Sequence, residues 1–500
     1  MLKNYFDLEL ENNQFTTFNT IRELVEYCNE HYADRVFVID SGREYTYGDV
    51  YSKIRKMAGA IAARQQNFGD IIALYADNNI NYIIGAMAAM CIGYPCVAIP
   101  ATTPIETLET LIAQYGIKTI MHTNSKTQAI QQCDTHLWQR RYKFQCFPIE
   151  FCSTFTQSIL DDGWANVVLP DNVAITLFTS GTDGQPRGVN LSHRNILTGM
   201  RNGMLGFKEV GYEDDGQIYQ LTIPLTHSFG LIRNLLCCMF TGSTLIISKN
   251  NKEIFADMQK YKPTRLITVP GFCDIILQMI KMGHTNITGN AFEYIVTGGA
   301  ALSQTTIQGF QQLNIPIYNG YGMTETSNLF MGNAHPWEYQ SNIGSLYPNS
   351  EYKIVDNELL VKGDNIFIGY FRENNQDTFD ADGYFHTGDL VEFNEDTGLF
   401  NFIGRKKQLI VLSSGVNISP AKLEAYFKDR VPFVQECCVY SPDNVNLICE
   451  YYSPTIPQDL TLLYKLNDKL NEEKITAFVY RKEPFPKTAK LEIQRKKAND

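Results

Sequence analysis

The 500-residue sequence lacks the features that mark several large protein classes. None of its 12 cysteines forms a Cys-x-x-Cys pair, which argues against zinc sites and a disulfide framework and favours free thiols in a reducing cytoplasm. Basic residues are not in excess either. Lys and Arg total 43 against 54 Asp and Glu, and the net charge of −11 argues against a nucleic acid partner.

Long apolar runs are also scarce. The acidic start, MLKNYFDLELENN, has no uninterrupted apolar stretch, so no secretory signal is expected. Residues 82–101 carry no charge over about the length that spans a bilayer, but Pro95 and two glycines interrupt them. A helix, a tight turn and a buried strand are the simpler interpretation, so we expect no membrane span.

What the sequence does have is a regular alternation up to Gly299. Short apolar runs such as RVFVID (35–40), AITLFT (174–179) and RLITVP (265–270) alternate with helical stretches such as residues 47–65. This alternation predicts βα units and mostly parallel sheets covered by helices on both faces. Beyond Gly299 the chain is richer in turns and hairpin-like strands.

A domain boundary is expected where charged residues, Arg405 to Gln408, separate two apolar strands. We place the large domain at 1–404 and a small α+β domain at 405–500. In the small domain we expect a helix that starts at Pro420 with Ser419 as its N-cap. Strands near 435–441 and 446–452 and a helix near 458–474 should follow.

The stretch LFTSGTDGQPRGVNLSHRN, residues 177–195, has the composition of an anion site. Glycines let backbone N–H groups crowd around an anion, and hydroxyls with a following cation complete a phosphate cradle. The residues that supply these parts are Thr179, Ser180, Gly181, Thr182, Gly184 and Arg187. The spacing does not fit a Walker A loop. A solvated turn remains the alternative, because Gly, Ser and Asp also form ordinary turns.

This loop resembles a known signature. TSGTDGQPRGV, residues 179–189, agrees at nine of eleven positions with the phosphate-binding motif of the adenylate-forming superfamily. That superfamily includes acyl-CoA synthetases, aryl-acid ligases, luciferases and peptide-synthetase adenylation domains.

Further motifs follow in the order that the superfamily prescribes. PLTHSFG (224–230) resembles the segment in which His227 and Phe229 would gate the acyl pocket. TGGAAL (297–302) resembles the stretch that lines adenine, and NGYGMTETS (319–327) resembles the most characteristic nucleotide motif. The resemblance implies that Tyr321 stacks on adenine, Thr324 meets the α-phosphate and Glu325 helps to hold magnesium. It also implies adenine or pocket contacts from Gly298, Gly299, Ala300, Ala301, Gly320, Gly322 and Met323.

Three motifs complete the resemblance toward the C-terminus. GYFHTGDL (383–390) carries Asp389, which is expected on the ribose hydroxyls. GRKKQLIVLSSGVNISP (404–420) resembles the hinge, with Arg405 as a second ribose contact and Lys407 at the pivot. PFPKTAKLEIQR (484–495) stands where the catalytic lysine belongs.

The resemblance implies the fold and the chemistry together. The expected fold is α/β: a large N-terminal domain of βα-rich subdomains plus a distorted β-barrel, with a small mobile α+β C-terminal domain. The implied reaction uses ATP and Mg²⁺ to convert a carboxylic acid to an acyl-adenylate, and then transfers the acyl group to a pantetheine thiol. That thiol belongs to coenzyme A or to an acyl or peptidyl carrier protein.

Departures from the pattern concern the charges at the site. Arg187 replaces the usual Lys and can still clamp a phosphate. Asp183 replaces Thr or Ser, and would repel a triphosphate unless it points outward or joins the magnesium shell. When the superfamily's C-terminal motif is aligned without gaps to residues 486–495, Glu492 occupies the position of the catalytic lysine. Lys490 is then the expected surrogate, with Lys487 as a second candidate. The residues given catalytic roles are Lys490, Lys487, His227, Thr324 and Glu325.

The substrate is expected to be an acid with an apolar body. No acid follows the gating motif to pair with a substrate amine, only Arg233, so an amino acid is not expected. The small and apolar pocket residues favour a medium or long acyl chain, or an aryl acid. Two other interpretations stay open: a catalytically weakened homologue that acts as a sensor or scaffold, and an adenylating enzyme that ends in other chemistry.

Overall fold

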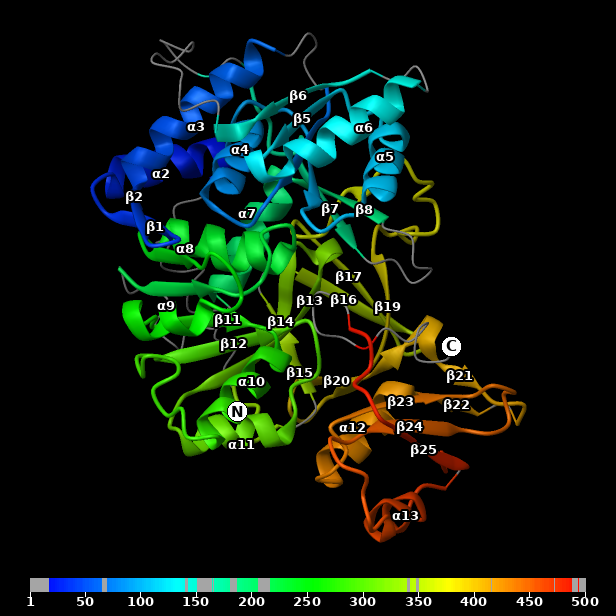
Figure 1. Ribbon diagram of the computed structural model, residues 1–500. Coiled ribbons are helices and arrows are strands. Elements are labelled where there is room, and N and C mark those ends of the chain that lie inside the picture. Colours follow the sequence, from blue (N-terminus) through cyan, green and yellow to red (C-terminus); the bar gives the residue numbers. More distant parts are fainter. Residues whose placement is uncertain are drawn as a thin grey trace.

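The computed structural model describes residues 18–64, 70–139, 143–150, 164, 166–179, 187–205, 216–339, 342–347, 350–414, 416–471, 473–487 and 493. Two large sheets with their helices form the body, and a smaller unit is attached at one end (Figure 1). The expected α/β class, with a large N-terminal and a small C-terminal domain, is confirmed.

The first sheet contains seven strands in the order β18-β8-β7-β4-β3-β5-β6. Its parallel members are β3 (Ile72–Ala76), β4 (Cys96–Pro100), β5 (Thr119–His122), β6 (Gln145–Pro148) and β7 (Val173–Thr179). β8 (Arg187–Ser192) runs antiparallel to β7, and β18 (Gly369–Tyr370) runs antiparallel to β8. The associated helices are α2 (Ile21–Tyr32), α3 (Tyr47–Ala62), α4 (Ile80–Cys91), α5 (Ile105–Gln114) and α6 (Thr127–Gln139).

The uncharged stretch 82–101 forms part of this sheet and its helical cover. It contains most of the buried 12-residue helix α4 and the buried strand β4, as predicted. Within the described ranges, no helix is long and apolar enough to span a bilayer.

The second sheet has thirteen strands in the order β16-β17-β19-β20-β15-β14-β13-β12-β11-β9-β10-β1-β2. One half is parallel: β1 (Val36–Asp40), β10 (Thr244–Ile247), β9 (Ile218–Leu221), β11 (Arg265–Thr268), β12 (Tyr294–Gly298) and β13 (Ile317–Met323). Strand β2 (Arg43–Thr46) closes that edge. The other half is antiparallel: β14 (Asn328–Asn333), β15 (Asn342–Leu346), β16 (Ser350–Val355), β17 (Glu358–Gly363), β19 (Phe385–Asn394) and β20 (Leu399–Arg405).

Helices cover both faces of the parallel half. Successive side chains of β11 and β12 point to opposite faces of the sheet. Ile267 and Val296 face one core, and Leu266 and Ile295 face another. The first core includes side chains of α7 (His193–Leu205), the π-helical segment η4 (Phe229–Leu236) and α8 (Cys237–Phe240). The second includes those of α9 (Ile254–Tyr261), α10 (Pro270–Lys281) and α11 (Gln304–Gln312).

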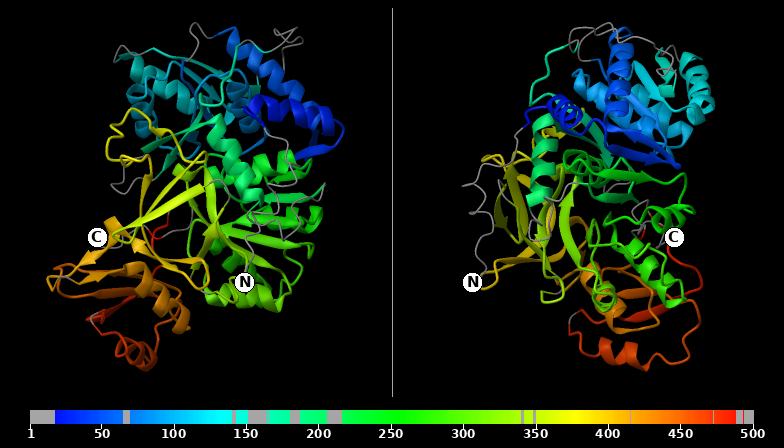
Figure 2. Two further views of the ribbon diagram at one scale, coloured as in Figure 1. Left: turned by 180° about the vertical axis from the view of Figure 1, so that it is seen from behind. Right: turned by 90° about the vertical axis from the view of Figure 1, so that its left-hand side faces the viewer.

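The strands that were expected to form a distorted barrel extend the second sheet instead. They do not close into a ring in the part of the chain that the structure describes, where β16 is the edge strand and pairs with β17. Figure 2 shows these strands, yellow in the figure, curling away from the parallel half.

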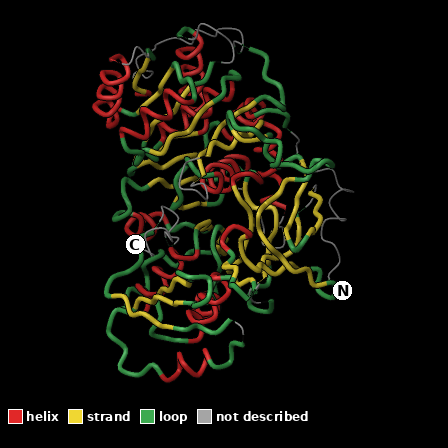
Figure 3. The backbone as a smooth tube through the Cα atoms, turned by 90° about the vertical axis from the view of Figure 1, so that its right-hand side faces the viewer, coloured by secondary structure: helices red, strands yellow, loops and turns green. Residues whose placement is uncertain are grey.

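The C-terminal unit has a hydrophobic core of its own, built from side chains between Leu412 and Ile475. Its elements are β21 (Ile410–Val411), β22 (Asn417–Ile418), α12 (Pro420–Arg430), β23 (Glu436–Tyr440), β24 (Ile448–Tyr452), α13 (Thr461–Asn467) and β25 (Ala477–Arg481). Ser419 Oγ accepts a hydrogen bond from Lys422 N and caps α12 as predicted, whereas α13 is shorter than the expected helix. Figure 3 shows this unit below the rest of the tube. A boundary between residues 404 and 405, with a hinge at Lys407, stays a proposal.

Candidate active site

Four parallel strands bring the central motifs to one edge of the second sheet. Neighbouring strands β9, β11, β12 and β13 run in the same direction, so their carboxyl ends meet at that edge. The segment 224–230 follows β9, 297–302 starts at the end of β12, and 319–327 starts within β13. In open α/β sheets, ligands bind at the carboxyl ends of the strands. The fold therefore places these three motifs where a ligand site is expected.

Two glycines are required by the backbone at this edge. A Cβ on Gly322 would lie 2.1 Å from the carbonyl oxygen of Asn328, because β14 returns against β13 at this point. Gly299, directly after β12, has a φ of +81°, which L side chains rarely adopt. The motif glycines thus permit the close strand crossing and the sharp turn that border the site.

A small pocket opens at this edge, and its volume is about 40 Å³. Six of its lining residues were predicted from the sequence: His227, Phe229, Gly299, Gly322, Met323 and Thr324. The predicted Gly298 and Gly320 are directly opposite residues of β12 and β13, and a Cβ on Gly298 would lie 3.3 Å from Phe229 Cζ. Ala300 and Ala301 are exposed beyond β12. Ligand pockets are usually about 300–1,000 Å³, so this pocket is smaller than a typical ligand site.

Tyr321, Asp389 and Arg405 form a polar group beside this pocket. Asp389 and Arg405 are directly opposite residues of β19 and β20. Arg405 Nε lies 3.2 Å from Asp389 Oδ1, and the Tyr321 hydroxyl donates a hydrogen bond to Asp389 Oδ2. Only 1% of Asp389 is exposed, and burial raises the pKa of its carboxyl group although Arg405 and Tyr321 oppose the shift. Burial also raises the pKa of the Tyr321 hydroxyl.

This group fits the ribose of a nucleotide. Within the described residues, no well-aligned hydrogen bond reaches Asp389 Oδ1. A carboxylate oxygen can accept two hydrogen bonds, so Asp389 keeps acceptor capacity for a vicinal diol. The partly buried ring of Tyr321 packs against Phe330 and Phe402 and is held in place for a stacking contact.

The ends of the phosphate-loop motif lie together. Thr179, the last residue of β7, is directly opposite Arg187, the first residue of β8. The Thr179 hydroxyl donates a hydrogen bond to the Arg187 carbonyl, at 3.5 Å. The predicted Ser180, Gly181, Thr182 and Gly184, together with Asp183, lie outside the described residues.

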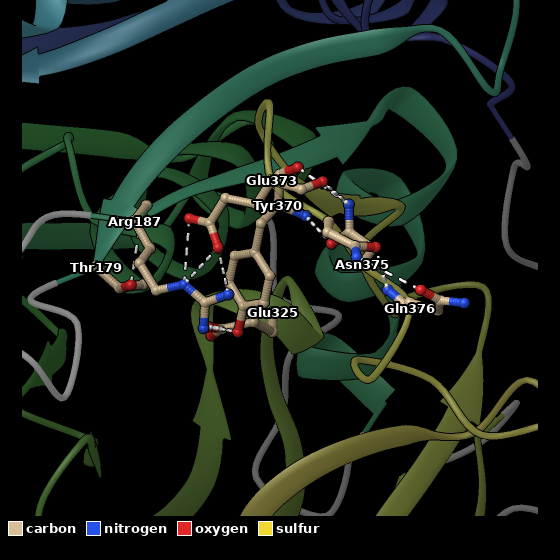
Figure 4. A network of polar contacts seen from close by, with 8 residues as sticks. Thr179, Arg187, Glu325, Tyr370, Glu373, Asn375 and Gln376 are labelled. Carbon is tan, nitrogen blue, oxygen red and sulfur yellow. Dashed lines mark hydrogen bonds and ion pairs between the residues drawn. The ribbon is translucent and has the colours of Figure 1, made fainter. Parts of the chain in front are cut away.

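Arg187 contacts two residues that the sequence interpretation missed, Glu373 and Tyr370, and Tyr370 connects it to Glu325 (Figure 4). Arg187 Nε donates to Glu373 Oε2 at 2.9 Å, and its guanidinium lies 3.5 Å from the centre of the Tyr370 ring. The Tyr370 hydroxyl in turn donates to Glu325 Oε1 at 2.9 Å. Hydrogen bonds to Glu373 raise the pKa of Arg187, so the guanidinium stays charged.

No sequence signal marked Glu373 or Tyr370, because β18 reaches Arg187 only through its pairing with β8. Tyr370 is directly opposite Val189 in that pair. The contact joins residues more than 180 positions apart, and only the tertiary structure creates it.

The metal prediction rests on Glu325, which lies in the 3-10 turn after β13. The described residues contain no group of three or more potential ligands that could hold a metal ion on their own. Mg²⁺ in nucleotide sites is usually held by one or two carboxylates together with substrate phosphates. A single carboxylate beside Thr324 and Arg187 therefore fits a magnesium ion that arrives with a polyphosphate.

The C-terminal lysine motif is described only at its ends. Lys487 Nζ forms an ion pair with Glu436 Oε1 of β23 at 2.6 Å, and Lys487 also forms a β-bridge with Ile493. Lys490, Leu491 and Glu492 lie outside the described residues. Lys487 is thus held against β23 within the proposed small domain, and its predicted catalytic role stays a prediction.

The fold and the site define a class of nucleotide-binding α/β proteins with a small C-terminal domain, and comparisons with known proteins give the family. Residues 25–371 match the AMP-binding enzyme family, so this chain belongs to that family. The chain is 27% identical over 481 residues to a 2-succinylbenzoate–CoA ligase of Staphylococcus epidermidis, an alignment that covers 93% of this chain and 94% of the relative.

Two solved structures have the same fold. One is the o-succinylbenzoate CoA synthetase of Bacillus subtilis with its acyl-adenylate intermediate, with a TM-score of 0.81, 19% identity and coverage of 95% of this chain and 98% of that one. The other is the anthranilate CoA ligase AuaEII with anthranoyl-AMP, with a TM-score of 0.82, 16% identity and coverage of 97% of both chains. The expected superfamily and an enzymatic role are thereby confirmed.

Proposed function

We propose that this enzyme activates a carboxylic acid with ATP and joins it to the thiol of coenzyme A. The observation that carries the proposal is the convergence at residues 321–325. Tyr321 contacts Asp389, which contacts Arg405, and Glu325 contacts Tyr370, which contacts Arg187. One segment of five residues thus connects the proposed ribose site to the proposed phosphate site.

In the first step, a carboxylate oxygen of the acid attacks the α-phosphorus of ATP. The bond between this phosphorus and the oxygen bridging to the β-phosphate breaks, and pyrophosphate leaves with that oxygen. Asp389 and Arg405 would hold the ribose, Thr324 would face the α-phosphate, and Arg187 would pair with the outgoing phosphates. Mg²⁺, held with Glu325, would neutralise the charge that develops on the phosphate oxygens.

In the second step, the thiol sulfur attacks the acyl carbonyl carbon, AMP leaves with the bridging oxygen, and the thiol proton passes to solvent. We propose that the small domain turns about Lys407 between the two steps, because the acyl group must meet ATP in the first step and the thiol in the second, in the same site. Lys406, next to this hinge, pairs with Glu358 of β17 at 2.9 Å and would tie the hinge to the large domain in this arrangement.

The acid would have an apolar body. The apolar side chains of Phe229, Met323 and Leu329 line the pocket. Two similar proteins are ligases of the aryl acids 2-succinylbenzoate and anthranilate, which favours an aryl acid for this chain too. The medium or long acyl chain expected from the sequence remains an alternative. We place the enzyme in a reducing cytoplasm, in line with the free cysteines of the described chain.

The test is pyrophosphate release with magnesium-ATP and a panel of aryl and aliphatic acids, followed by mass analysis for acyl-AMP and for the coenzyme A thioester. We expect both products with at least one acid. Adenylate without thioester would move the acceptor to a carrier protein or to other chemistry. ATP binding without any release would support a sensor or scaffold and would contradict the proposal.

A further inference from the structure

A second cavity lies along α7, and its volume of about 190 Å³ exceeds that of the pocket at the carboxyl edge. Helix α7 supplies most of its lining. Part of that lining is apolar: Leu197, Met200 and Met204 are buried. Phe18 and Phe240 also line the cavity, and their rings meet edge to face with centres 5.8 Å apart. Such walls suit the apolar body of a small molecule.

Arg201 of α7 brings a charged group into this lining. Its side chain is partly buried, and its buried Nε has no hydrogen-bond partner among the residues that the structure describes. Buried polar atoms are paired in the great majority of cases. The other arginine of the lining, Arg194, already donates two hydrogen bonds to Asp171, at 2.7 and 3.3 Å. Arg201 is therefore the cation that a ligand in this cavity would meet.

The lining indicates the chemistry of that ligand. A guanidinium pairs most strongly with an oxyanion, and its planar fork matches a carboxylate. Asp364 opposes an anion, but it is the only acidic residue of the described lining, which also contains Arg194 and Arg201. A bare inorganic ion would leave Leu197 and Met204 without contacts, so an organic anion fits better. The cavity is smaller than a typical ligand site and suits an aromatic ring or a short chain.

Helix α7 separates this cavity from the acid pocket. Residues two positions apart on a helix point about 200° apart, so Arg201 and Gly203 lie on opposite faces of α7. A Cβ on Gly203 would lie 2.9 Å from Cδ of the fully buried Arg233 of η4 and 3.1 Å from Asn328 Nδ2. Asn328 lines the acid pocket. The cavity and the pocket are thus on the two sides of one helix.

Gly199, one turn before Gly203, makes a second close contact on the pocket side of α7. A Cβ on Gly199 would lie 2.7 Å from the carbonyl oxygen of Ser327. Ser327 directly follows the 3-10 turn that carries Glu325, the expected magnesium ligand. Protein interiors are close-packed and transmit small displacements. A ligand that fixes one face of α7 therefore affects the segment that we expect to contact ATP.

We propose that this cavity is a regulatory site, separate from the acid pocket, that binds a small carboxylate with an apolar body such as an aromatic ring. The carboxylate pairs with Arg201, and the body packs on Leu197, Met200 and Met204. Binding fixes α7 and thereby changes the affinity for ATP. The site goes beyond the proposed function, and no covalent step takes place in it.

The probe is phenylacetate, and an NMR titration measures its binding to the full-length enzyme without ATP. Three matched probes separate its parts: phenylacetamide has the body without the charge, acetate has the charge without the body, and phenylethylamine has the opposite charge. The variants are Arg201→Met, Arg201→Lys as the conservative change, and Thr198→Phe, which fills the cavity from a partly buried lining position. The matched control is Arg430→Met, which removes an exposed arginine of α12.

We expect phenylacetate to bind the wild type with a Kd of about 0.1–1 mM, as is usual for a ligand of this size. The three matched probes should bind at least about tenfold more weakly. Arg201→Met should raise the Kd for phenylacetate by about 10- to 100-fold, because a charged hydrogen-bonding partner is lost. Arg201→Lys should recover part of the binding, Thr198→Phe should abolish it, and Arg430→Met should leave it unchanged.

Equal binding of phenylacetate to the wild type and to Arg201→Met would overturn the site, since a probe seated in the acid pocket would behave in that way. Equal or tighter binding of phenylacetamide or phenylethylamine would also overturn it. If Arg201→Met fails to fold, the series of probes and Thr198→Phe still decide.

The regulatory role has its own test. Calorimetry measures ATP binding without magnesium, so that no adenylate forms, with and without saturating phenylacetate. We expect the Kd for ATP to change by about fivefold or more in the wild type and to stay constant in Arg201→Met. The same shift in both proteins, or no shift in either, would overturn the regulation. Failure of the proposed function would look different, because pyrophosphate release would then be absent while the probe still bound.

Discussion

Asp389 of β19 and Arg405 of β20 are directly opposite residues of an antiparallel strand pair, with Arg405 Nε 3.2 Å from Asp389 Oδ1. A strand ladder, and not a loop, thus sets the geometry of this pair. Asp389 comes from the body and Arg405 from the last strand before the small domain. The proposed ribose site is therefore rigid on one side and adjoins the proposed hinge on the other.

Asp389→Asn should raise the stability of the fold at pH 7 and weaken the use of ATP. Burial raises the pKa of Asp389, so the folded protein binds its proton more readily than the unfolded chain does. The protonated form stabilises the fold, and this contribution is lost as the pH rises from the unfolded pKa through the raised folded pKa. We expect the variant to melt above the wild type at pH 7 and to lose this advantage below about pH 4.

The same variant should raise the KM for ATP by about 10- to 100-fold, because an amide accepts the ribose hydroxyls less strongly than a carboxylate does. Thermal unfolding between pH 4 and pH 8 tests the effect on stability, and ATP titrations of pyrophosphate release test the effect on the KM for ATP. Tyr321→Phe keeps the ring but removes the donor to Asp389, and should affect ATP less. An unchanged KM in Asp389→Asn would remove Asp389 from the nucleotide site.

Glu373→Gln should strengthen ATP binding. Glu373 pairs with Arg187, the cation that we expect on the phosphates, so nucleotide and carboxylate compete for one guanidinium. Both side chains are about one-third exposed, and such pairs are weak. We therefore expect the KM for ATP to fall by about two- to fivefold, measured by pyrophosphate release at a saturating acid concentration.

The matched control is Glu351→Gln, which removes a different exposed carboxylate, the acceptor of the Tyr384 hydroxyl. It should leave the KM for ATP unchanged. A higher KM in Glu373→Gln would mean that Glu373 orients Arg187 for the phosphates and does not compete with them.

Lys487 and Lys490 of the C-terminal motif should contribute unequally to adenylate formation. Lys487 is held by Glu436, so Lys487→Ala alone should lower adenylate formation only slightly. Lys490→Ala, and the double variant with Lys487→Ala, should lower it by about 100-fold, the usual effect of removing one charge-stabilising donor from a transition state. Single-turnover formation of acyl-AMP is the measurement. Glu436→Gln, which releases Lys487, serves as the control, and unchanged turnover in the double variant would exclude both lysines.

Much of this site could be predicted from the sequence because the motifs follow strands. A residue directly after a parallel strand must lie at the carboxyl edge of the sheet, and Gly299 and Thr324, both predicted as nucleotide contacts, line one pocket at that edge. The barrel was wrong in detail, since sequence motifs do not report whether a curled sheet closes. Arg233 was noted only as the nearest charge, because burial of a side chain depends on α7 and β14 packing over η4 from distant parts of the chain. The contact between Glu373 and Arg187 could not be predicted for the same reason, because it also joins distant parts of the chain.

His193→Asn should make the fold less sensitive to acid. His193 is buried at the start of α7, and its Nδ1 accepts a hydrogen bond from the backbone N–H of Ile21 at 3.2 Å. Burial lowers the pKa of His193 from 6.5 to about 4, so between these values the unfolded chain binds a proton that the folded chain does not. Stability therefore falls as the pH drops through this range, by on the order of 3 kcal/mol in total from this one group.

Asparagine keeps an acceptor for Ile21 N but does not titrate. Urea unfolding at pH 7.5, 6 and 5 should show a steep loss of unfolding free energy in the wild type and a shallower one in the variant. Parallel curves would mean that other groups, and not His193, set the acid sensitivity of this fold.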